Sequence, residues 1–226
     1  MDKTKNIELI IKNKIIAIIR TDISEGLEKI VEMLSISGIK ILEVSFNTPG
    51  ALKWIERLSN RFEDEVLIGA GTVIDSETAV SAISAGAKFI ISPILKKQII
   101  KICLRHKIIS VPGIFTPTEA LTAHEEGADF VKLFPAGNLG PDYIKAIKTP
   151  LPQLQIISVG GINLSNARKF LDNGACALAI GDSLVSKEAI KNKDYKLIKE
   201  NAKKFIDCIN DDRNHNNYYK QINYLS

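Results

Sequence analysis

Apolar runs rich in isoleucine and valine alternate along this chain with segments whose apolar residues recur at helical spacing. The apolar runs predict eight β-strands: Ile15–Arg20, Lys40–Ser45, Val66–Gly71, Lys88–Ser92, Ile108–Val111, Asp129–Phe134, Gln155–Val159 and Ala177–Gly181. The segments between them predict helices, among them Ser24–Ser37, Ala51–Asn60, Ser76–Ala85, Lys96–His106 and Thr118–Glu126. Strands this uniformly apolar are typical of a parallel sheet covered on both faces.

Glycines mark the ends of four predicted helices, at Gly38, Gly86, Gly127 and Gly174. Glycine tolerates the left-handed conformation that ends a helix, so these positions are helix stops with a physical cause. Eight strand–helix units predict an α/β fold, a (β/α)8 TIM barrel preceded by a short N-terminal helix. An open doubly wound sheet is the alternative, but no Gly-x-Gly-x-x-Gly motif follows the first strand.

The barrel is expected to form one domain over residues 1–209, because no internal linker divides the chain. Residues 210–226 differ in composition: they are polar and rich in asparagine. We interpret this stretch as a C-terminal tail that lies outside the barrel domain.

Composition excludes several classes of protein. The chain has 226 residues, 45% of them hydrophobic, so global disorder is not expected. The net charge of +4 is spread along the chain, which suits anionic small molecules and does not indicate nucleic acid. The three cysteines and three histidines are scattered, without metal-ligand spacing. No apolar run approaches the roughly 18 residues of a membrane span, and no signal peptide is evident, so we expect a cytoplasmic protein.

Lys132 carries the strongest chemical signal. On a strand, alternate residues share a face, so Phe130, Lys132 and Phe134 should point the same way. Burial between aromatic rings would lower the pKa of this lysine from about 10.4 and favour the neutral amine. A neutral amine can attack a ketone and form a Schiff base. The alternative is a lysine at the strand end whose amine reaches solvent.

Other candidate residues lie at the carboxyl ends of the predicted strands, where barrels of this class collect their functional groups. Glu43 shares a face with Ile41 and Ser45 and should point inward, either for proton transfer or in an ion pair. Arg20 ends the first strand, and Thr72 follows Gly71 at the end of the third, in a ligand-binding loop or a tight turn.

Glycine-bearing loops follow the seventh and eighth strands, where such barrels often bind phosphate through backbone amides. Gly160 and Gly161 lie in the first loop, and Asp182 and Ser183 lie in the second. Asp182 weakens the phosphate interpretation, because its carboxylate would repel a phosphate dianion.

Taken together, these segments resemble the class I aldolases that cleave 2-keto-3-deoxy-6-phosphogluconate (KDPG) or 4-hydroxy-2-oxoglutarate (KHG). The matching stretches occur in order, one per barrel unit, over roughly residues 7 to 205: Leu42–Ser45, Ile68–Val73, Phe89–Pro93, Val111–Glu119, Val131–Ala136 and Gly160–Ile162. Each motif alone is weak, but the ordered set is specific.

The resemblance implies a role for each candidate residue. Lys132 would form the Schiff base with the keto acid, and Glu43 would move protons during carbinolamine formation and aldol cleavage. Thr72 would hold the pyruvate carboxylate. The pocket walls and the far end of the substrate would be contributed by Pro93, Phe134, Gly160, Gly161, Asp182 and Ser183. The family is typically a homotrimer, and its covalent imine on lysine requires no cofactor and no metal.

Three departures from the family pattern leave the substrate open. Asn47 occupies the position where many members carry an arginine, and Arg20 could supply that charge from the first strand, as in the related 6-phosphogalactonate aldolases. Residues 158–161 also resemble those galactonate enzymes. Asp182 stands where a small hydroxyl residue is usual, although Ser183 follows it. Two other functions remain as alternatives: a sugar-phosphate isomerase or epimerase, and a barrel retained as a binding module.

Overall fold

The computed structural model describes residues 2–23, 25–63 and 65–211. Its strands are β1 (Ile15–Ile19), β2 (Ile41–Ser45), β3 (Leu67–Gly71), β4 (Phe89–Ile91), β5 (Ile109–Val111), β6 (Gly113–Ile114), β7 (Val131–Leu133), β8 (Ile156–Val159) and β9 (Ala177–Ile180). Its helices are α1 (Lys3–Asn13), α2 (Leu27–Ile36), α3 (Ala51–Arg61), α4 (Ser76–Ser84), α5 (Lys97–His106), α6 (Pro117–Glu125), α7 (Ala136–Leu139), α8 (Pro141–Lys148), α9 (Ala167–Asp172), α10 (Lys187–Lys191) and α11 (Tyr195–Asn210).

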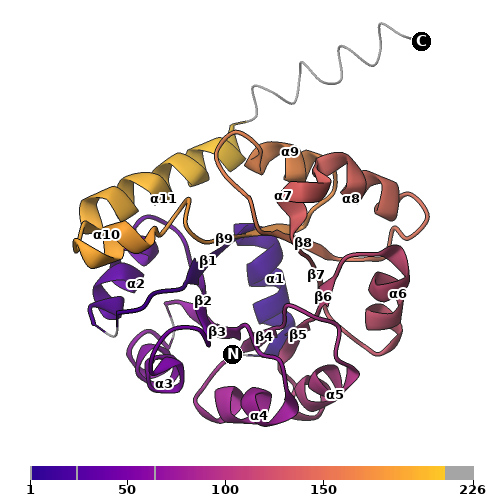
Figure 1. Ribbon diagram of the computed structural model, residues 1–226, viewed down its shortest axis with the longest axis horizontal. Coiled ribbons are helices and arrows are strands. Elements are labelled where there is room, and N and C mark those ends of the chain that lie inside the picture. The colour runs from indigo at the N-terminus through magenta and orange to yellow at the C-terminus, as the bar shows by residue number, and fades with distance from the viewer. Residues whose placement is uncertain (1, 24, 64, 212–226) are drawn as a thin grey trace, which may run out of the picture.

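The strands form one parallel sheet in the order β5-β4-β3-β2-β1-β9-β8-β7-β6. β5 and β6 are two parts of one strand, interrupted at Pro112, which has no backbone N–H to donate. This strand closes the barrel, because β5 pairs with β4 while β6 pairs with β7. The amide of Lys132 also donates to the carbonyl of Pro112, at 2.8 Å. Viewed along the barrel, the helices form a ring around the strands (Figure 1).

The predicted barrel is confirmed. All eight predicted strands are present within a residue or two of their expected limits, and the fifth extends past Pro112 as β6. The closed order of strands is incompatible with an open doubly wound sheet. All four glycines expected at helix ends have positive φ angles, between 88° and 104°. The predicted helix at Ser24–Ser37 begins later, at Leu27, and Ser24 itself lies outside the described residues.

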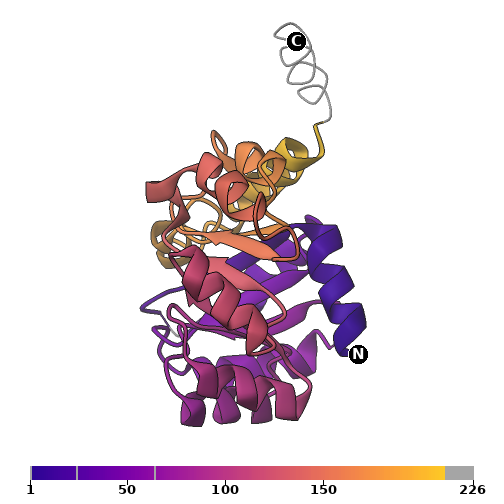
Figure 2. The same ribbon diagram turned by 90° about the vertical axis from the view of Figure 1, so that its right-hand side faces the viewer.

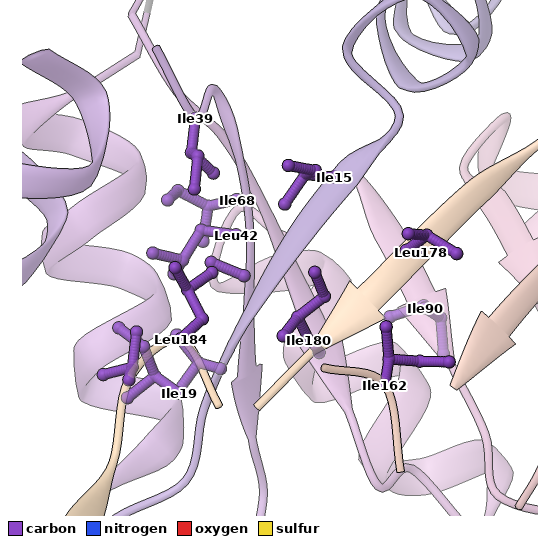
Figure 3. Packing of buried hydrophobic residues seen from close by; sticks show 14 of the residues in the cluster. Ile15, Ile19, Ile39, Leu42, Ile68, Ile90, Ile162, Leu178, Ile180 and Leu184 are labelled. Atoms are coloured by element: carbon purple, nitrogen blue, oxygen red, sulfur yellow. The ribbon is translucent and has the colours of Figure 1, made fainter. Parts of the chain in front are cut away.

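Two apolar layers hold the barrel together. The larger lies between the strands and the surrounding helices, and Figure 3 shows part of it, including Ile15, Leu42 and Leu178. The smaller layer fills the barrel interior, where Ile41, Phe89 and other inward side chains meet. Fully burying one such side chain stabilises the fold by roughly 1.5–3 kcal/mol. This rigid frame fixes where each strand ends.

Helix α1 closes the amino-terminal end of the barrel. Its Ile10 is fully buried and joins the interior apolar layer. The helix crosses the barrel opening in Figure 1 and lies against one end of the barrel in Figure 2. Access to the interior is therefore left to the opposite, carboxyl end of the strands.

The predicted C-terminal tail, residues 210–226, overlaps the last helix by one residue, because α11 ends at Asn210. Asp211 follows the helix, and residues 212–226 of the predicted tail lie outside the described residues.

Candidate active site

A cavity of about 280 Å³ opens at the carboxyl end of the barrel, between β1, β2, β7, β8 and β9 and the loops that follow them. Its lining combines apolar, glycine and charged residues: Ile18, Arg20, Glu43, Lys132, Phe134, Val159, Gly160, Gly161, Ile162, Ala179, Gly181, Asp182 and Ser183. Eight of the ten residues expected at the site lie in this lining, and the other two, Thr72 and Pro93, do not.

Lys132 lies in the middle of β7 and faces the barrel interior, with only 5% of its surface exposed. Burial is the largest influence on its amine and lowers its pKa, because the charged form loses its water. Glu43 opposes this shift and Arg20 reinforces it. The Nζ atom lies 4.7 Å from the centre of the Phe134 ring, whose face weakly favours the cation.

The aromatic surroundings of Lys132 differ on its two sides. Phe130 is buried in the barrel interior below the lysine, as expected. Phe134 is 36% exposed and forms part of the cavity wall, so the amine lies beneath an opening rather than between two buried rings. This placement leaves Lys132 desolvated but accessible from the cavity.

Glu43 lies on β2, also inside the barrel, and is 1% exposed. Burial raises the pKa of its carboxyl group, while Lys132 and Arg20 pull that pKa downward to a smaller extent. Its Oε2 atom has no hydrogen-bond partner among the described residues. A buried carboxyl oxygen without a partner is costly, and such groups are concentrated at functional sites.

Gly71 provides the space that Glu43 occupies. A Cβ atom built on Gly71 would lie 1.5 Å from the Glu43 Oε1 atom. The same inward position two residues earlier, Gly69, makes room for the ring of Phe89. The glycines at the end of β3 therefore leave room for the Glu43 carboxyl group and the Phe89 ring.

The pKa shifts of Lys132 and Glu43 both favour neutral groups. A neutral amine is a nucleophile toward a ketone, and a neighbouring carboxyl group can give a proton when protonated and take one when ionised. The site thus holds the two groups that imine chemistry needs. The structure rules out the alternative of a lysine that extends its amine into bulk solvent.

Arg20 and the glycine loops form the outer part of the cavity. Arg20 is exposed, and its guanidinium is close enough to influence the pKa of both buried groups. Gly160 and Gly161 have φ angles of 88° and 74°, and Gly160 accepts a hydrogen bond from the amide of Gly137 at 2.8 Å. Asp182 and Ser183 are exposed at the mouth.

Thr72 and Pro93 lie on the other side of the barrel rim. The Thr72 hydroxyl is 2.8 Å from the hydroxyl of Ser45, at the end of β2. Pro93 packs closely against Gly113, where a Cβ atom would lie 2.4 Å from the proline carbonyl. Their contacts with a substrate stay predictions.

Sequence reasoning missed the apolar floor of the cavity. Ile18 and Ala179 line it from β1 and β9, with Val159 and Ile162 beside them. Strand alternation carries the signal for Ile18, which stands two residues before Arg20 and therefore shares its face. Ile162 follows the strand, so no periodicity applies to it.

Within the described parts of the chain, no three histidine, cysteine or acidic residues gather as metal ligands. No helix among the described residues is long and apolar enough to cross a membrane.

Comparison with known proteins agrees with this geometry. The family model "KDPG and KHG aldolase" matches residues 7–201. A probable 2-dehydro-3-deoxy-6-phosphogalactonate aldolase of Rhizobium meliloti is 34% identical over 75% of this chain and 81% of the relative. A 2-dehydro-3-deoxy-phosphogluconate aldolase of Haemophilus influenzae is 33% identical over 90% of this chain and 96% of the relative.

A solved structure is similar in fold as well. The KDPG aldolase of Legionella pneumophila, captured with pyruvate as a covalent carbinolamine, aligns with a TM-score of 0.78 and 33% identity. The alignment covers 87% of this chain and 96% of that one. The matched family model spans the whole barrel, including both buried catalytic candidates, and the chain therefore belongs to the KDPG and KHG aldolase family.

Proposed function

We propose that this aldolase acts through a Schiff base on Lys132 and releases pyruvate from a 2-keto-3-deoxy acid. The observation that carries the proposal is the pairing of a buried lysine of lowered pKa with a buried glutamate of raised pKa in one cavity. The substrates we propose are 2-keto-3-deoxy-6-phosphogluconate, giving pyruvate and glyceraldehyde 3-phosphate, and 4-hydroxy-2-oxoglutarate, giving pyruvate and glyoxylate. The galactonate epimer of the first is the alternative.

The reaction begins when the neutral amine of Lys132 attacks the keto carbon at C2. Glu43 protonates the resulting alkoxide, and loss of water from the carbinolamine leaves a protonated imine. Glu43 then accepts the proton of the C4 hydroxyl while the C3–C4 bond breaks. The bonding electrons pass into the imine to give an enamine, and the aldehyde departs. Protonation at C3 and hydrolysis of the imine release pyruvate and restore the lysine.

This mechanism needs no external cofactor or metal, because the protonated imine itself accepts the electrons of the broken bond.

Arg20 supplies the positive charge near the substrate, because position 47, where many family members carry an arginine, is an asparagine in this chain. Its position in the cavity lining supports this role, since Asn47 is absent from that lining. An arginine on the first strand also favours the galactonate alternative. Thr72 would hold the carboxylate, and Gly160, Gly161 and Ser183 would face the far end of the substrate, where Asp182 weakens phosphate binding.

The test is pyruvate release from each of the three keto acids, followed with lactate dehydrogenase. The wild-type chain should release pyruvate from at least one of them, and Lys132→Ala should release none. Loss of a keto acid without pyruvate would instead indicate the isomerase or epimerase alternative, whose acid–base chemistry has no use for an imine.

We also propose that the chain forms a homotrimer. Three large apolar side chains are exposed in consecutive loops at the barrel rim: Ile74 after β3, Ile94 after β4 and Phe115 after β6. Neighbouring exposed apolar residues are typical of a surface covered by a partner. Light scattering should give the mass of three chains, and Phe115→Asp should lower the measured mass.

For the cellular location we propose the cytoplasm, since the three cysteines are free thiols, as is usual in a reducing compartment.

A further inference from the structure

The carboxyl ends of β2 and β3 are joined by a side-chain hydrogen bond that the aldolase mechanism does not use. The Ser45 hydroxyl lies 2.8 Å from the Thr72 hydroxyl. Ser45 is fully buried, two residues after Glu43 on the same inward face. Among the described residues, Thr72 Oγ1 has no other hydrogen-bond partner.

The backbone at Thr72 is unusual. Its φ angle is +60°, in the left-handed region that β-branched residues rarely adopt. A strained residue persists only where its surroundings hold it, and such residues cluster at ligand sites. The short bond to Ser45 is one of the contacts that hold the side chain of Thr72 in place.

The other hydrogen bonds of Ser45 indicate which of the two hydroxyls, Ser45 or Thr72, is the donor in the bond between them. The amide of Asn47 donates to Ser45 Oγ at 3.4 Å, so one lone pair of that oxygen is engaged. The Ser45 proton has two acceptors within reach, Thr72 Oγ1 at 2.8 Å and Asn47 Oδ1 at 3.4 Å. The shorter contact is the stronger. When Ser45 donates to Thr72 Oγ1, the O–H group of Thr72 can donate a hydrogen bond to a third group.

We infer that Ser45 is a positioning residue: it holds and polarises the Thr72 hydroxyl as a donor to the carboxylate of the bound keto acid. A donor that itself accepts a hydrogen bond becomes a stronger donor, and a carboxylate accepts only. The inference rests on the proposed function, because it assumes that a 2-keto acid binds with its carboxylate beside Thr72. It assigns to Ser45 an effect on binding and none on proton transfer.

The experiment uses pyruvate alone, so that the aldehyde partner does not enter. The enzyme exchanges the methyl protons of pyruvate for deuterium through the enamine, and NMR gives kcat and KM for this exchange. Ser45→Ala should raise KM about five- to tenfold, the loss of one net hydrogen bond, with kcat within about twofold. Ser45→Thr, which keeps the hydroxyl, should restore KM.

A double-mutant cycle separates positioning from a merely structural role. In a Thr72→Val background, Ser45→Ala should cause no further rise in KM. Ser158→Ala is the matched control, because Ser158 is another fully buried strand serine, and its hydroxyl has no partner among the described residues. This control should leave KM unchanged, and circular dichroism should show each variant folded.

Three results would overturn the inference: an unchanged KM in Ser45→Ala, an equal rise in both backgrounds, or a fall in kcat at constant KM. In each of these the wild-type chain still exchanges protons, so the proposed function survives. If the wild-type chain shows neither exchange nor a trapped pyruvate adduct, the proposed function itself fails, and the inference fails with it.

Discussion

The two ends of the barrel differ in how completely their charged side chains are paired. At the amino end, just before β7, the Asp129 carboxylate accepts hydrogen bonds from the amide and hydroxyl of Ser110 and pairs with Lys3 of α1 at 2.9 Å. At the carboxyl end, Lys132 lies on β7 itself, three residues after Asp129. Here one carboxyl oxygen of Glu43 has no hydrogen-bond partner within the described part of the chain.

The difference indicates that the carboxyl end lowers the stability of the fold in order to hold reactive groups. Satisfied charges at the amino end help to fix α1 over the barrel opening, whereas the carboxyl end leaves an amine and a carboxyl group desolvated, at a cost to the fold. The same desolvation lowers the pKa of the Lys132 amine. The predictions below change one end while the other serves as its control.

The largest effect should come from Lys132→Ala. Without the amine no imine forms, so pyruvate release should fall by about 10⁵-fold or more. Its stability should equal or exceed that of the wild type, because a desolvated amine is removed. Lys3→Ala, at the opposite end, is the control and should retain activity. An active Lys132→Ala enzyme would refute the mechanism.

The same variant has a pH signature. Because the folded-state pKa of Lys132 is lowered, the unfolded chain binds more protons at this residue between that pKa and about 10.4. The contribution of Lys132 to stability is therefore least at low pH and rises with pH through this window. Thermal unfolding of wild type and Lys132→Ala at several pH values should show the variant's advantage shrinking as pH rises; a constant difference would contradict the lowered pKa.

The next largest effect is expected from Gly71→Ala, which places a Cβ atom where the Glu43 carboxyl group lies. Moving that carboxyl group should lower kcat about 10²- to 10⁴-fold, the usual contribution of general acid–base catalysis. Gly69→Ala is the matched control on the same strand, β3, because a Cβ atom at Gly69 would meet the ring of Phe89 on β4 instead of Glu43. The control should lose stability and keep more of its kcat. Equal losses of kcat would show that the defect is general.

A smaller effect is expected from Arg20→Ala. Loss of a charge-assisted hydrogen bond to the substrate should raise KM about 10- to 100-fold. Because Arg20 lowers the pKa of Lys132, its removal should also raise that pKa and move the acid limb of the kcat/KM profile to higher pH. Unchanged kcat and KM in Arg20→Ala would remove this residue from the substrate site.

The smallest effect belongs to the amino end. Lys3→Ala breaks a partly exposed ion pair and should cost about 1 kcal/mol of unfolding free energy, decreasing at high salt. Urea unfolding at low and high salt measures this loss. A loss far above this value would mean that α1 depends on this one contact.

The sequence predicted the barrel and the positions of Lys132 and Glu43, because strand alternation and glycine helix stops are local signals. It did not predict the break at Pro112 between β5 and β6, although proline's missing N–H was a clue. The pairing of Ser45 with Thr72 and the fit of Glu43 against Gly71 join different strands. Such contacts depend on the register between neighbouring strands, and the pattern of apolar and polar residues along a single strand does not specify that register.

Borohydride trapping with pyruvate, followed by intact mass and peptide mapping, tests the central claim most directly. Reduction converts an imine into a stable secondary amine, so the account predicts one pyruvate-derived adduct per chain, on Lys132. Lys132→Ala should carry none. A folded wild-type chain that gives no adduct, under conditions in which a known class I aldolase is trapped, would contradict the account.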